Sequence, residues 1–431
     1  MIIIYIYLNL LLMSLLLNSL VVSDPSSKYH NSLVNILISS DGKINKISKN
    51  KINTKAKKII NFDSCNVSVG WVDFYANFCD PGFENKEDLE SGVKLASKSG
   101  FTDVVIKHNT NPVIQNKNDI SYIKNKSFNT FCKVYPTASI TKNSCGEEMN
   151  ELIDLFKEGA VAFSDSNLQN SELILNVLLY LKQFNGLYIS NPKDIYLSKG
   201  LVNDGLNSNI LGLKSIPSIS EIIGIERDLS ILTYSEGRIH FSGISTKESV
   251  NLIRKAKKTG LNVTCDVPIY NLILDDNEIL DFDTNYKVFP PLRSTSDIDE
   301  LLKGLDDGTV DVITSNHEPQ DFDSKNCEFE KASFGIISQQ TFFSNLVELS
   351  RKISFDKLLT KITVNPRNIL GITNPEIKEG SYASLTIYDE KGSWDYNDST
   401  NLSKSSNSPW MNWSLRGNVK GVVSGNKTNI V

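Results

Sequence analysis

Polar side chains that could do chemistry follow short apolar runs in this sequence. The run Val69–Phe74 is typical of a buried strand, and Tyr75 and Asn77 come directly after it, ahead of a Pro-Gly turn. A later run, Val310–Thr314, is followed by a Ser-Asn-His-Glu-Pro stretch that contains Asn316. In a parallel barrel the carboxyl ends of the strands share one face, and active sites lie there. We therefore expect these side chains to meet in one site.

The sequence is poor in side chains that bind a transition metal. It contains four histidines, His30, His108, His240 and His317, whereas a binuclear zinc hydrolase spends about four histidines on metal alone. The six cysteines are scattered, without a CxxC pair, which indicates reduced, cytosolic thiols rather than disulfides or a zinc knuckle. We expect no resident cofactor.

The composition is that of an ordinary globular protein with a large core. The chain has 431 residues, of which 40% are hydrophobic and 22% are charged, and its net charge is −5. This acidic balance favours neither nucleic acid nor an anionic membrane surface as a partner. We expect a cytoplasmic protein.

The first residues are strongly apolar, but they do not match a targeting segment. Met1–Leu17 lacks a basic region and a small-x-small cleavage site, so it differs from a signal peptide. It is also too short, and too interrupted by Asn9 and Ser14, for a spanning helix. We expect translation to start near Met13 and Leu15–Val22 to form the first strand of a small β domain.

Residues 13–68 have the pattern of a small β domain. Short apolar segments separated by turn residues predict strands at Leu15–Val22, Val34–Ser39, Lys46–Ser48 and Lys58–Phe62. The Asp41-Gly42 pair predicts a hairpin turn between the second and third of these strands. Short β segments return after residue 377, so we expect one side domain built from residues 13–68 and 378–431.

Between residues 69 and 377 the pattern changes to alternating strands and helices. Strands are predicted at Val69–Phe74, Asp103–Lys107, Thr130–Val134, Ala160–Ser164, Leu187–Ser190, Arg238–Ser242, Asn262–Asp266 and Val310–Thr314. Helices are predicted at Glu87–Lys98, Glu148–Phe156, Ser171–Phe184, Lys247–Lys258, Ile336–Arg351 and Phe355–Leu359. This alternation predicts an α/β fold, a (β/α)8 TIM barrel over residues 69–377.

Several segments together resemble the dihydroorotases of the amidohydrolase superfamily. They are Asp80–Asp88, His108–Pro112, Gly159–Asp165, Asn285–Arg293, Val364–Gly371 and Lys404–Pro409. The resemblance runs from the N-terminal strands to about residue 423. It implies an amidohydrolase barrel, a β-sandwich side domain and a role in pyrimidine synthesis. Since a fold does not carry an activity with it, the site needs its own argument.

The resemblance also places the metal ligands, and most of them are replaced. The two histidines after the first barrel strand correspond to Tyr75 and Asn77. The histidine after the fifth strand corresponds to Asn191, and the second histidine after the sixth corresponds to Gly243. A bridging carboxylate is retained as Asp165. The catalytic aspartate corresponds to Asn316, which cannot titrate.

The implied substrate contacts are altered as well. The arginine that grips the substrate carboxylate corresponds to Cys79, whereas Asn109 keeps a position that contacts the pyrimidine ring. Arg293 could anchor either a loop or an anion. Cys79 as a nucleophile would need a nearby base. Asp165 is more consistent with a structural remnant than with a catalytic base.

These observations favour a degenerate dihydroorotase-like protein without hydrolytic activity. The resemblance includes non-catalytic copies that assemble with aspartate transcarbamoylase, so we expect a structural or regulatory partner of that enzyme in a homo- or hetero-oligomer. The alternative is an active dihydroorotase or cyclic-amide hydrolase with an unusual metal, such as zinc, or with none. A third interpretation is a module that binds a pyrimidine through Asn109 without turnover.

Overall fold

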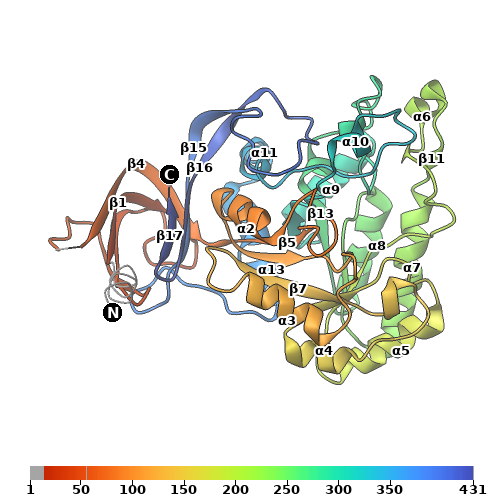
Figure 1. The fold of residues 1–431 in the computed structure, drawn as a ribbon, viewed down its shortest axis with the longest axis horizontal. Helices are drawn as coiled ribbons and strands as arrows, with labels where there is room; N and C mark the ends of the chain where they lie inside the picture. Colours follow the sequence, from red (N-terminus) through yellow and green to blue (C-terminus); the bar gives the residue numbers. More distant parts are fainter. Residues whose placement is uncertain (1–13, 55, 431) are drawn as a thin grey trace.

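The computed structural model describes residues 14–54 and 56–430 and contains a barrel with a side sheet (Figure 1). Residues 1–13 lie outside the described residues, so the expected start near Met13 remains a prediction. The predicted first strand is present as β1, Leu15–Val22. In the described part of the chain, no helix is both long enough and apolar enough to cross a bilayer.

The barrel is an eight-stranded sheet in the order β14-β13-β12-β9-β8-β7-β6-β5, and every neighbouring pair is parallel. Its strands are β5 (Trp71–Ala76), β6 (Phe101–Ile106), β7 (Lys133–Ser139), β8 (Ala162–Ser164), β9 (Tyr188–Ser190), β12 (Ile239–Phe241), β13 (Val263–Pro268) and β14 (Val312–Thr314). The predicted TIM barrel is confirmed.

The two end strands of this sheet, β5 and β14, are joined through a buried carboxylate. Asp73 of β5 accepts hydrogen bonds from the Ser315 N–H at 3.1 Å and from the Ser315 hydroxyl at 2.5 Å. Gln339 donates to the same carboxylate at 2.7 Å. Further along both segments, the Asn77 N–H donates to the His317 carbonyl at 2.9 Å. These contacts tie the start of the barrel to its end.

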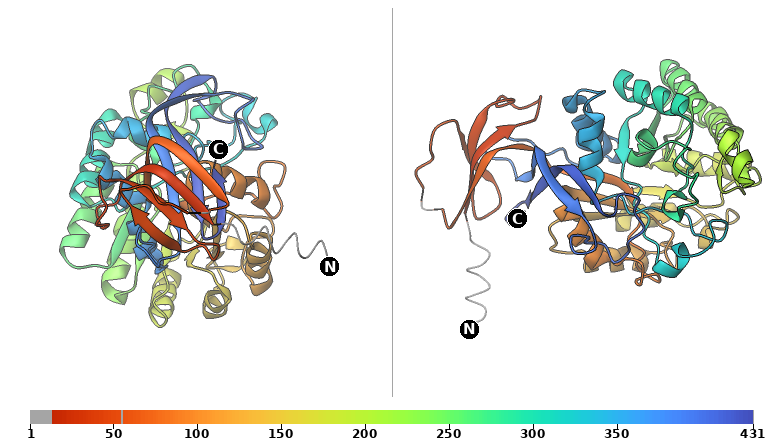
Figure 2. Two further views of the ribbon diagram at one scale, coloured as in Figure 1. Left: turned by 90° about the vertical axis from the view of Figure 1, so that its left-hand side faces the viewer. Right: turned by 90° about the horizontal axis from the view of Figure 1, so that it is seen from above.

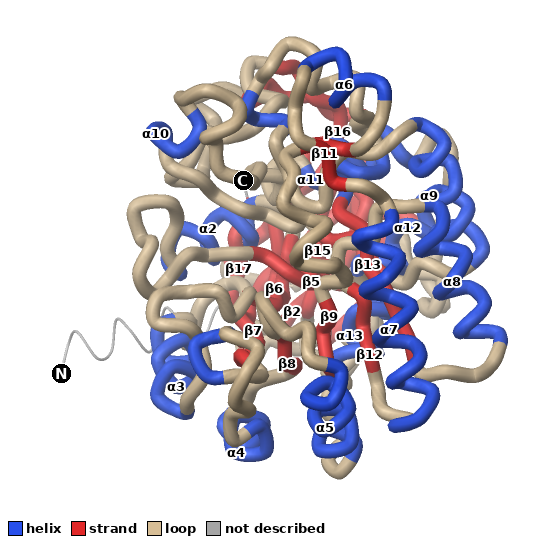
Figure 3. Tube along the Cα trace, turned by 90° about the vertical axis from the view of Figure 1, so that its right-hand side faces the viewer, coloured by secondary structure: helices blue, strands red, loops and turns tan. Residues whose placement is uncertain are grey.

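Helices surround the barrel, as Figure 3 shows. They are α2 (Leu89–Lys98), α3 (Lys117–Lys126), α4 (Leu152–Glu158), α5 (Ser171–Lys182), α7 (Ile219–Ser235), α8 (Lys247–Lys258), α9 (Thr295–Asp307), α11 (Phe342–Leu349), α12 (Phe355–Ile362) and α13 (Val364–Leu370). The predicted helix over Ile336–Arg351 begins only at Phe342, because residues 336–341 run irregularly beside the barrel mouth.

Helix α8 illustrates why these segments fold as they do. Its N-cap Thr246 accepts a hydrogen bond from the Ser249 N–H at 3.2 Å, which satisfies a free donor of the first turn. Val250, Ile253 and Ala256 are buried on one face, at helical spacing. Such apolar stripes pack the helices against the strands and hold the strand ends rigidly.

Strands from both chain ends form one side sheet beside the barrel (Figure 2). It has the order β17-β16-β15-β4-β1-β2-β3 and contains β2 (Leu33–Ile38), β3 (Ile44–Ser48), β4 (Lys58–Val69), β15 (Ser384–Tyr396), β16 (Trp413–Ser424) and β17 (Lys427–Ile430). The predicted hairpin is confirmed, since β2 and β3 pair antiparallel around Gly42, whose φ is 84°. Residues 397–412, between β15 and β16, return to the barrel mouth, where Asn407 accepts a hydrogen bond from the Gln320 N–H at 3.1 Å.

Two long connecting segments lie at the carboxyl ends of the barrel strands. Between β9 and α7, the chain forms β10 (Val202–Asn203), α6 (Leu206–Leu211) and β11 (Ser215–Ile216). Between β14 and α11 it contains the short helix α10 (Phe322–Lys325). These segments stand at the carboxyl ends of the strands, so they shape the mouth of the barrel.

We expect the buried Arg367 to be essential for stability. Its guanidinium donates to the Gly70 carbonyl at 2.7 Å and pairs with the buried Asp103. It therefore joins α13 to the amino-terminal ends of β5 and β6. Arg367→Ala leaves a buried carboxylate without its partner, which costs about 3–5 kcal/mol of unfolding free energy. Urea unfolding measures this loss.

The matched control is Arg351→Ala. Arg351 pairs with Glu348 on the surface, where the two side chains are 62% and 50% exposed, so its removal should cost less than about 1 kcal/mol. Equal losses in the two variants would contradict the structural role of Arg367.

Candidate functional site

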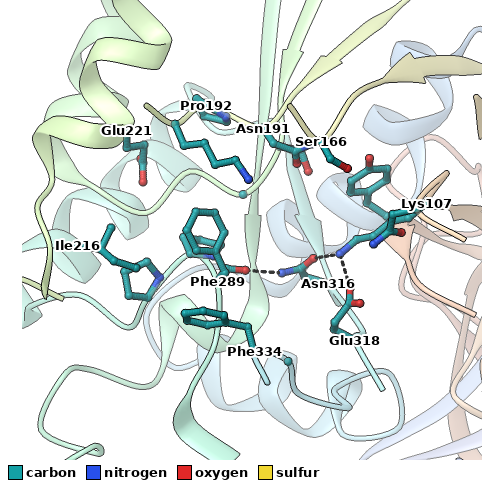
Figure 4. Close-up of a pocket in the computed structure, with 18 of the residues that line it drawn as sticks. Lys107, Ser166, Asn191, Pro192, Ile216, Glu221, Phe289, Asn316, Glu318 and Phe334 are labelled. Carbon is teal, nitrogen blue, oxygen red and sulfur yellow. Dashed lines mark hydrogen bonds and ion pairs between the residues drawn. The ribbon is translucent and has the colours of Figure 1, made fainter. Parts of the chain in front are cut away.

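A cavity of about 260 Å³ opens at the carboxyl ends of the barrel strands (Figure 4). Among the residues predicted from sequence, its wall contains Tyr75, Asn109, Asn191, Gly243, Arg293 and Asn316. Three of the predicted residues, Asn77, Cys79 and Asp165, are not part of that wall. The wall also contains Lys107, Lys193 and Glu318, which were not predicted as site residues.

Tyr75 fills the floor of this cavity. Its side chain is 3% exposed, and its hydroxyl lies within hydrogen-bonding reach of Ser164 and Asn191. Burial raises the pKa of the Tyr75 phenol to about 12, so the group stays neutral at physiological pH. Two positions that correspond to metal ligands, Tyr75 and Asn191, thus line the same cavity, where the Asn191 amide donates to the Ser164 hydroxyl at 3.2 Å.

Lys107 brings a positive charge to the same floor. Its ammonium donates to Asn316 Oδ1 at 2.7 Å and to Glu318 Oε2 at 2.8 Å, and it lies 5.3 Å from the centre of the Tyr75 ring (Figure 4). The Lys107 side chain is only 13% exposed, so solvent screens this ion pair weakly. The protein itself therefore supplies a cation at the carboxyl ends of the first, second and eighth barrel strands.

Asn316 is fully engaged in fixed contacts. While its carbonyl oxygen accepts from Lys107, its amide nitrogen donates to the Tyr270 hydroxyl at 2.6 Å and to the Phe289 carbonyl at 3.2 Å. Its φ of 46° is in the left-handed region, which asparagine tolerates better than most residues. Asn316 thus acts as a structural link between β14 and the loops above the cavity.

Asn77 and Cys79 lie below the wall. Asn77 donates to Glu318 Oε1 at 2.7 Å and accepts from the Cys79 N–H at 2.8 Å. Burial, aided by the negative charge of Glu318, raises the pKa of the Cys79 thiol far above its ordinary value. A thiol of this kind is a poor nucleophile, and its position outside the wall prevents it from replacing an arginine that grips a ligand.

Asp165 is bound into the protein. One carboxylate oxygen accepts from the Thr141 N–H at 3.0 Å and from the Thr141 hydroxyl at 2.5 Å, and the other accepts from the Asn167 N–H at 3.0 Å. With these bonds the carboxylate holds the loop after β7. Its role in the structure is therefore to fix that loop.

The barrel histidines also have structural surroundings. Both ring nitrogens of the buried His240 are bonded, to Asp266 at 3.0 Å and to Thr264 at 2.8 Å. His317 is buried, with its Nε2 3.8 Å from Glu87 Oε2. His108 contacts Ser144 at 3.1 Å, and burial lowers the pKa of His108 to about 4, so its ring stays neutral.

The backbone conformation at position 243 favours glycine over a metal-binding side chain. Its φ is 72°, its N–H donates to Asp266 Oδ1 at 2.7 Å, and a Cβ there would lie 3.3 Å from Pro290 Cδ. Any larger residue at this position would be strained, at a cost of roughly 1–2 kcal/mol. A histidine at position 243 would be a costly ligand in this chain.

Arg293 is used to hold the loops on one side of the cavity. Its guanidinium donates to the Ser245 hydroxyl at 3.0 Å, to Asn203 Oδ1 at 2.9 Å and to the Ile216 carbonyl at 2.9 Å. It also lies 3.8 Å from Glu221. Burial lowers the pKa of Arg293, and the negative charge of Glu221 opposes this. The donors of Arg293 are thus largely consumed by the protein.

The donor set does not fit a catalytic zinc. Across residues 14–54 and 56–430, no three His, Cys, Asp or Glu side chains gather in a way that could hold a metal ion. The groups that face the floor are a phenol, two amides, an ammonium and one carboxylate, that of Glu318, which is already bonded to Lys107 and Asn77. Zinc prefers several imidazole, thiolate or carboxylate donors.

Sequence reasoning could have found Lys107 from one signal. It is the last residue of the predicted barrel strand Asp103–Lys107, at the end of a strand where functional residues of this fold concentrate. Lys193 and Glu318 follow the fifth and eighth strands in the same way. The sequence does not predict the distance between Lys107 and Asn316, because that distance depends on the register of the strands.

The fold and the place of the cavity define the class of protein, a barrel of the amidohydrolase type. The L-hydantoinase (dihydropyrimidinase) from Arthrobacter aurescens superimposes with a TM-score of 0.85 over 97% of both chains. Its sequence identity is 18%, so this likeness shows the fold alone.

Sequence relatives identify the family. The dihydroorotase of Ruminiclostridium cellulolyticum is 37% identical over 90% of this chain and 92% of its own length. The dihydroorotase of Geobacter metallireducens is 35% identical over 96% of this chain and 99% of its own. Residues 66–249 match the family described as Dihydro-orotase-like. The chain belongs to the dihydroorotase family.

We expect Cys79 to be unreactive in the folded protein. Cys145 is exposed, Cys327 is partly exposed, and Cys79 is buried with a raised pKa, so iodoacetamide at pH 8 should modify Cys145 first, then Cys327, and Cys79 only after unfolding in urea. Mass spectrometry of digested samples gives the order, and a Cys145→Ser variant isolates the slower sites. Modification of Cys79 as fast as Cys145 would instead support a reactive thiol.

Proposed function

We propose that this chain is a dihydroorotase-like protein of pyrimidine biosynthesis that does not hydrolyse dihydroorotate and that supports aspartate transcarbamoylase as a structural or regulatory partner. The membership in the dihydroorotase family supports the pathway. The observation that carries the loss of activity is the Lys107 ammonium, bonded to Asn316 and Glu318 beside the Tyr75 ring.

Lys107 opposes a metal electrostatically. A divalent cation between the strand ends would stand beside a weakly exposed ammonium whose only carboxylate partner within ion-pair distance in the described chain is Glu318. Two unpaired like unit charges 4 Å apart repel by about 4 kcal/mol at an effective dielectric of 20, and the Glu318 carboxylate, 2.8 Å from the ammonium, offsets part of this repulsion. The Tyr75 phenol adds a steric obstacle, because it extends across the floor to Asn191. Both effects act in the same direction.

Proton transfer is opposed as well. Hydrolysis of a cyclic amide needs a group that takes a proton from water and returns it to the leaving nitrogen. Asn316 cannot titrate, and its amide is already bonded to Lys107, Tyr270 and Phe289. Glu318 is the carboxylate of the wall that shares Lys107 with Asn316, but its two oxygens are bonded to Asn77 and Lys107.

The proposed partner role is based on a barrel that keeps the family fold while the residues at its cavity are replaced. Large apolar side chains remain exposed on the segment between β9 and α7, among them Tyr196 at 75%, Leu206 at 75% and Ile210 at 65%, and such surfaces are common at protein contacts. All six cysteines are free thiols, which fits a cytoplasmic location.

We expect the purified protein to contain no stoichiometric zinc and to catalyse neither dihydroorotate hydrolysis nor the reverse cyclisation above background. The same assays apply to a repaired set, Tyr75→His, Asn77→His, Asn191→His and Asn316→Asp, with Gly243 kept because of its strained backbone. Zinc should bind this set on the order of 100-fold more tightly when Lys107→Met is added, because the repulsion is removed.

Elemental analysis and zinc titration measure these outcomes. One or two tightly held zinc ions in the wild-type chain, or chelator-resistant turnover, would favour the active alternative. Equal zinc affinity with and without Lys107 would refute the electrostatic argument while leaving the family assignment intact.

We expect aspartate transcarbamoylase to co-purify with the chain from its native source. A Lys107→Met variant should still co-purify, because the contact would involve the outer surface rather than the cavity. Mass spectrometry of the complex, after size-exclusion chromatography, identifies the partner. Absence of a transcarbamoylase from the wild-type complex would refute the partner role.

A further inference from the structure

Two lysines are buried together in the segments that border one side of the cavity, residues 283–291 and 322–335. Lys287 is 2% exposed and Lys325 is 7% exposed. Across residues 14–54 and 56–430, no carboxylate lies within 4.0 Å of either ammonium group. A buried charge without a counter-charge is costly, so burial opposes the protonation of both side chains.

The two ammonium groups cross-link these segments through backbone carbonyls. Lys325, on the short helix α10, donates from Nζ to the Thr284 carbonyl at 2.7 Å and to the Lys287 carbonyl at 3.3 Å. In the other direction, Lys287 Nζ donates to the Phe329 carbonyl at 2.8 Å and to the Glu330 carbonyl at 2.9 Å. Each segment therefore provides one lysine and the carbonyl groups that hold the other lysine.

The same segments form part of the cavity wall. Phe289 comes from the first segment, and Phe334 and Gly335 come from the second. The two phenylalanine rings are neighbours in Figure 4, with their centres 6.1 Å apart. The Lys287 ammonium lies 5.1 Å from the centre of the Phe334 ring, and the Lys287 carbonyl accepts from the Gly335 N–H at 3.0 Å. A movement of Lys287 would therefore shift two residues of the wall.

Three other titratable groups act on the two lysines. The negative charge of Asp283 acts on Lys325, and that of Glu330 acts on Lys287. The Cys327 thiol, when ionised, acts on both. None of these groups forms an ion pair with either lysine among the described residues, so the positive charges are only partly offset.

The buried and the hydrated lysine differ in their affinity for a proton. Burial and the positive charge of Lys287 lower the pKa of Lys325 to about 7, whereas a lysine in water titrates near ~10.4. Burial also lowers the pKa of Lys287. A lysine that leaves its buried position therefore takes up a proton, so opening becomes more favourable as the pH falls towards about 7 and changes little below it.

We propose that residues 283–291 and 322–335 form a pH-sensitive flap over the cavity, which opens when the two buried lysines take up protons and become hydrated. On opening, the carbonyl groups of Thr284, Phe329 and Glu330 lose their lysine donors, and Phe289 and Phe334 separate at the wall. The flap controls access to the cavity, and it does so whether or not the chain hydrolyses a substrate.

Hydrogen exchange of the full chain between pH 7 and pH 9, followed by mass spectrometry and corrected for the intrinsic exchange rate, measures this opening. We expect peptides from residues 322–335 to exchange roughly 50-fold faster at pH 7 than at pH 9 after correction, from a pKa of about 7 in the closed flap and ~10.4 in the open one. Peptides from the barrel strands β6 and β7 should show no such change.

Two substitutions of Lys325 separate its charge from its size. Lys325→Met should keep residues 322–335 protected at pH 7 and should remove most of the pH dependence, because methionine fills a similar space without a charge. Lys325→Arg keeps the charge across the whole range, so its flap should exchange rapidly at pH 9 as well. If Lys325→Met fails to fold, Lys325→Arg alone decides, since exchange as slow as in the wild type at pH 9 would refute the flap.

Lys331→Met is the matched control, because it removes an equal charge from the same segment. Lys331 is 74% exposed and pairs with Glu328 at 3.2 Å, so this variant should behave like the wild type. Cys327→Ser should also behave like the wild type, which excludes a thiol, a group that ordinarily titrates near ~8.5, as the source of the pH dependence.

The opposite outcomes are equally clear. Corrected exchange of residues 322–335 that is equal at pH 7 and pH 9, or faster at pH 9, would overturn the proposal. The same holds for an unchanged pH dependence in Lys325→Met or a lost one in Cys327→Ser. A parallel change in the barrel peptides would show unfolding of the whole barrel instead of a flap, and would overturn it too.

Discussion

The buried carboxylate of Asp73 is the constraint on which the site depends. It lies in β5 and receives donors from Ser315, just after β14, and from Gln339. A buried carboxylate is costly unless each oxygen is bonded, so these donors fix the distance between the two end strands. Because Tyr75 and Asn316 stand directly beyond this junction, their separation is set by the closure of the barrel.

The polar groups above this junction satisfy one another. Lys107, Asn316, Glu318 and Asn77 form a continuous set of hydrogen bonds, in which both oxygens of Glu318 are bonded. Buried networks of this kind add rigidity, whereas catalytic sites usually keep groups poised for a substrate. In this cavity the floor is a finished structural network, and Lys193 is the polar side chain that still lacks a counter-charge within the described residues.

The sequence predicted the architecture well because apolar periodicity and turn residues report on it directly. The Asp41-Gly42 hairpin and the strand Leu15–Val22 were recognised in this way and are present. The strand predicted at Thr130–Val134 was misplaced: it occupies Lys133–Ser139, where Pro136 within it weakens a strand prediction. The candidate site positions at the strand ends could be predicted from motifs. The contacts between their side chains inside the cavity could not. The reach of Tyr75 to Asn191, and of Lys107 to Asn316, depends on strand register and side-chain direction, which local patterns do not encode.

The replacements at the floor of the cavity act as a unit. If a histidine replaced Tyr75 alone, the hydroxyl near Asn191 and Ser164 would be lost, and the Lys107 ammonium would lose the phenol ring beside it. If an aspartate replaced Asn316 alone, it would place a second carboxylate beside Glu318, and it would remove the amide donor from Tyr270 and Phe289. Each of these single substitutions therefore leaves polar groups without a hydrogen-bond partner. The energies of such neighbouring substitutions are not additive. The Lys107 ammonium and its hydrogen-bond partners therefore hold the ends of the first, second and eighth barrel strands together as one coupled set.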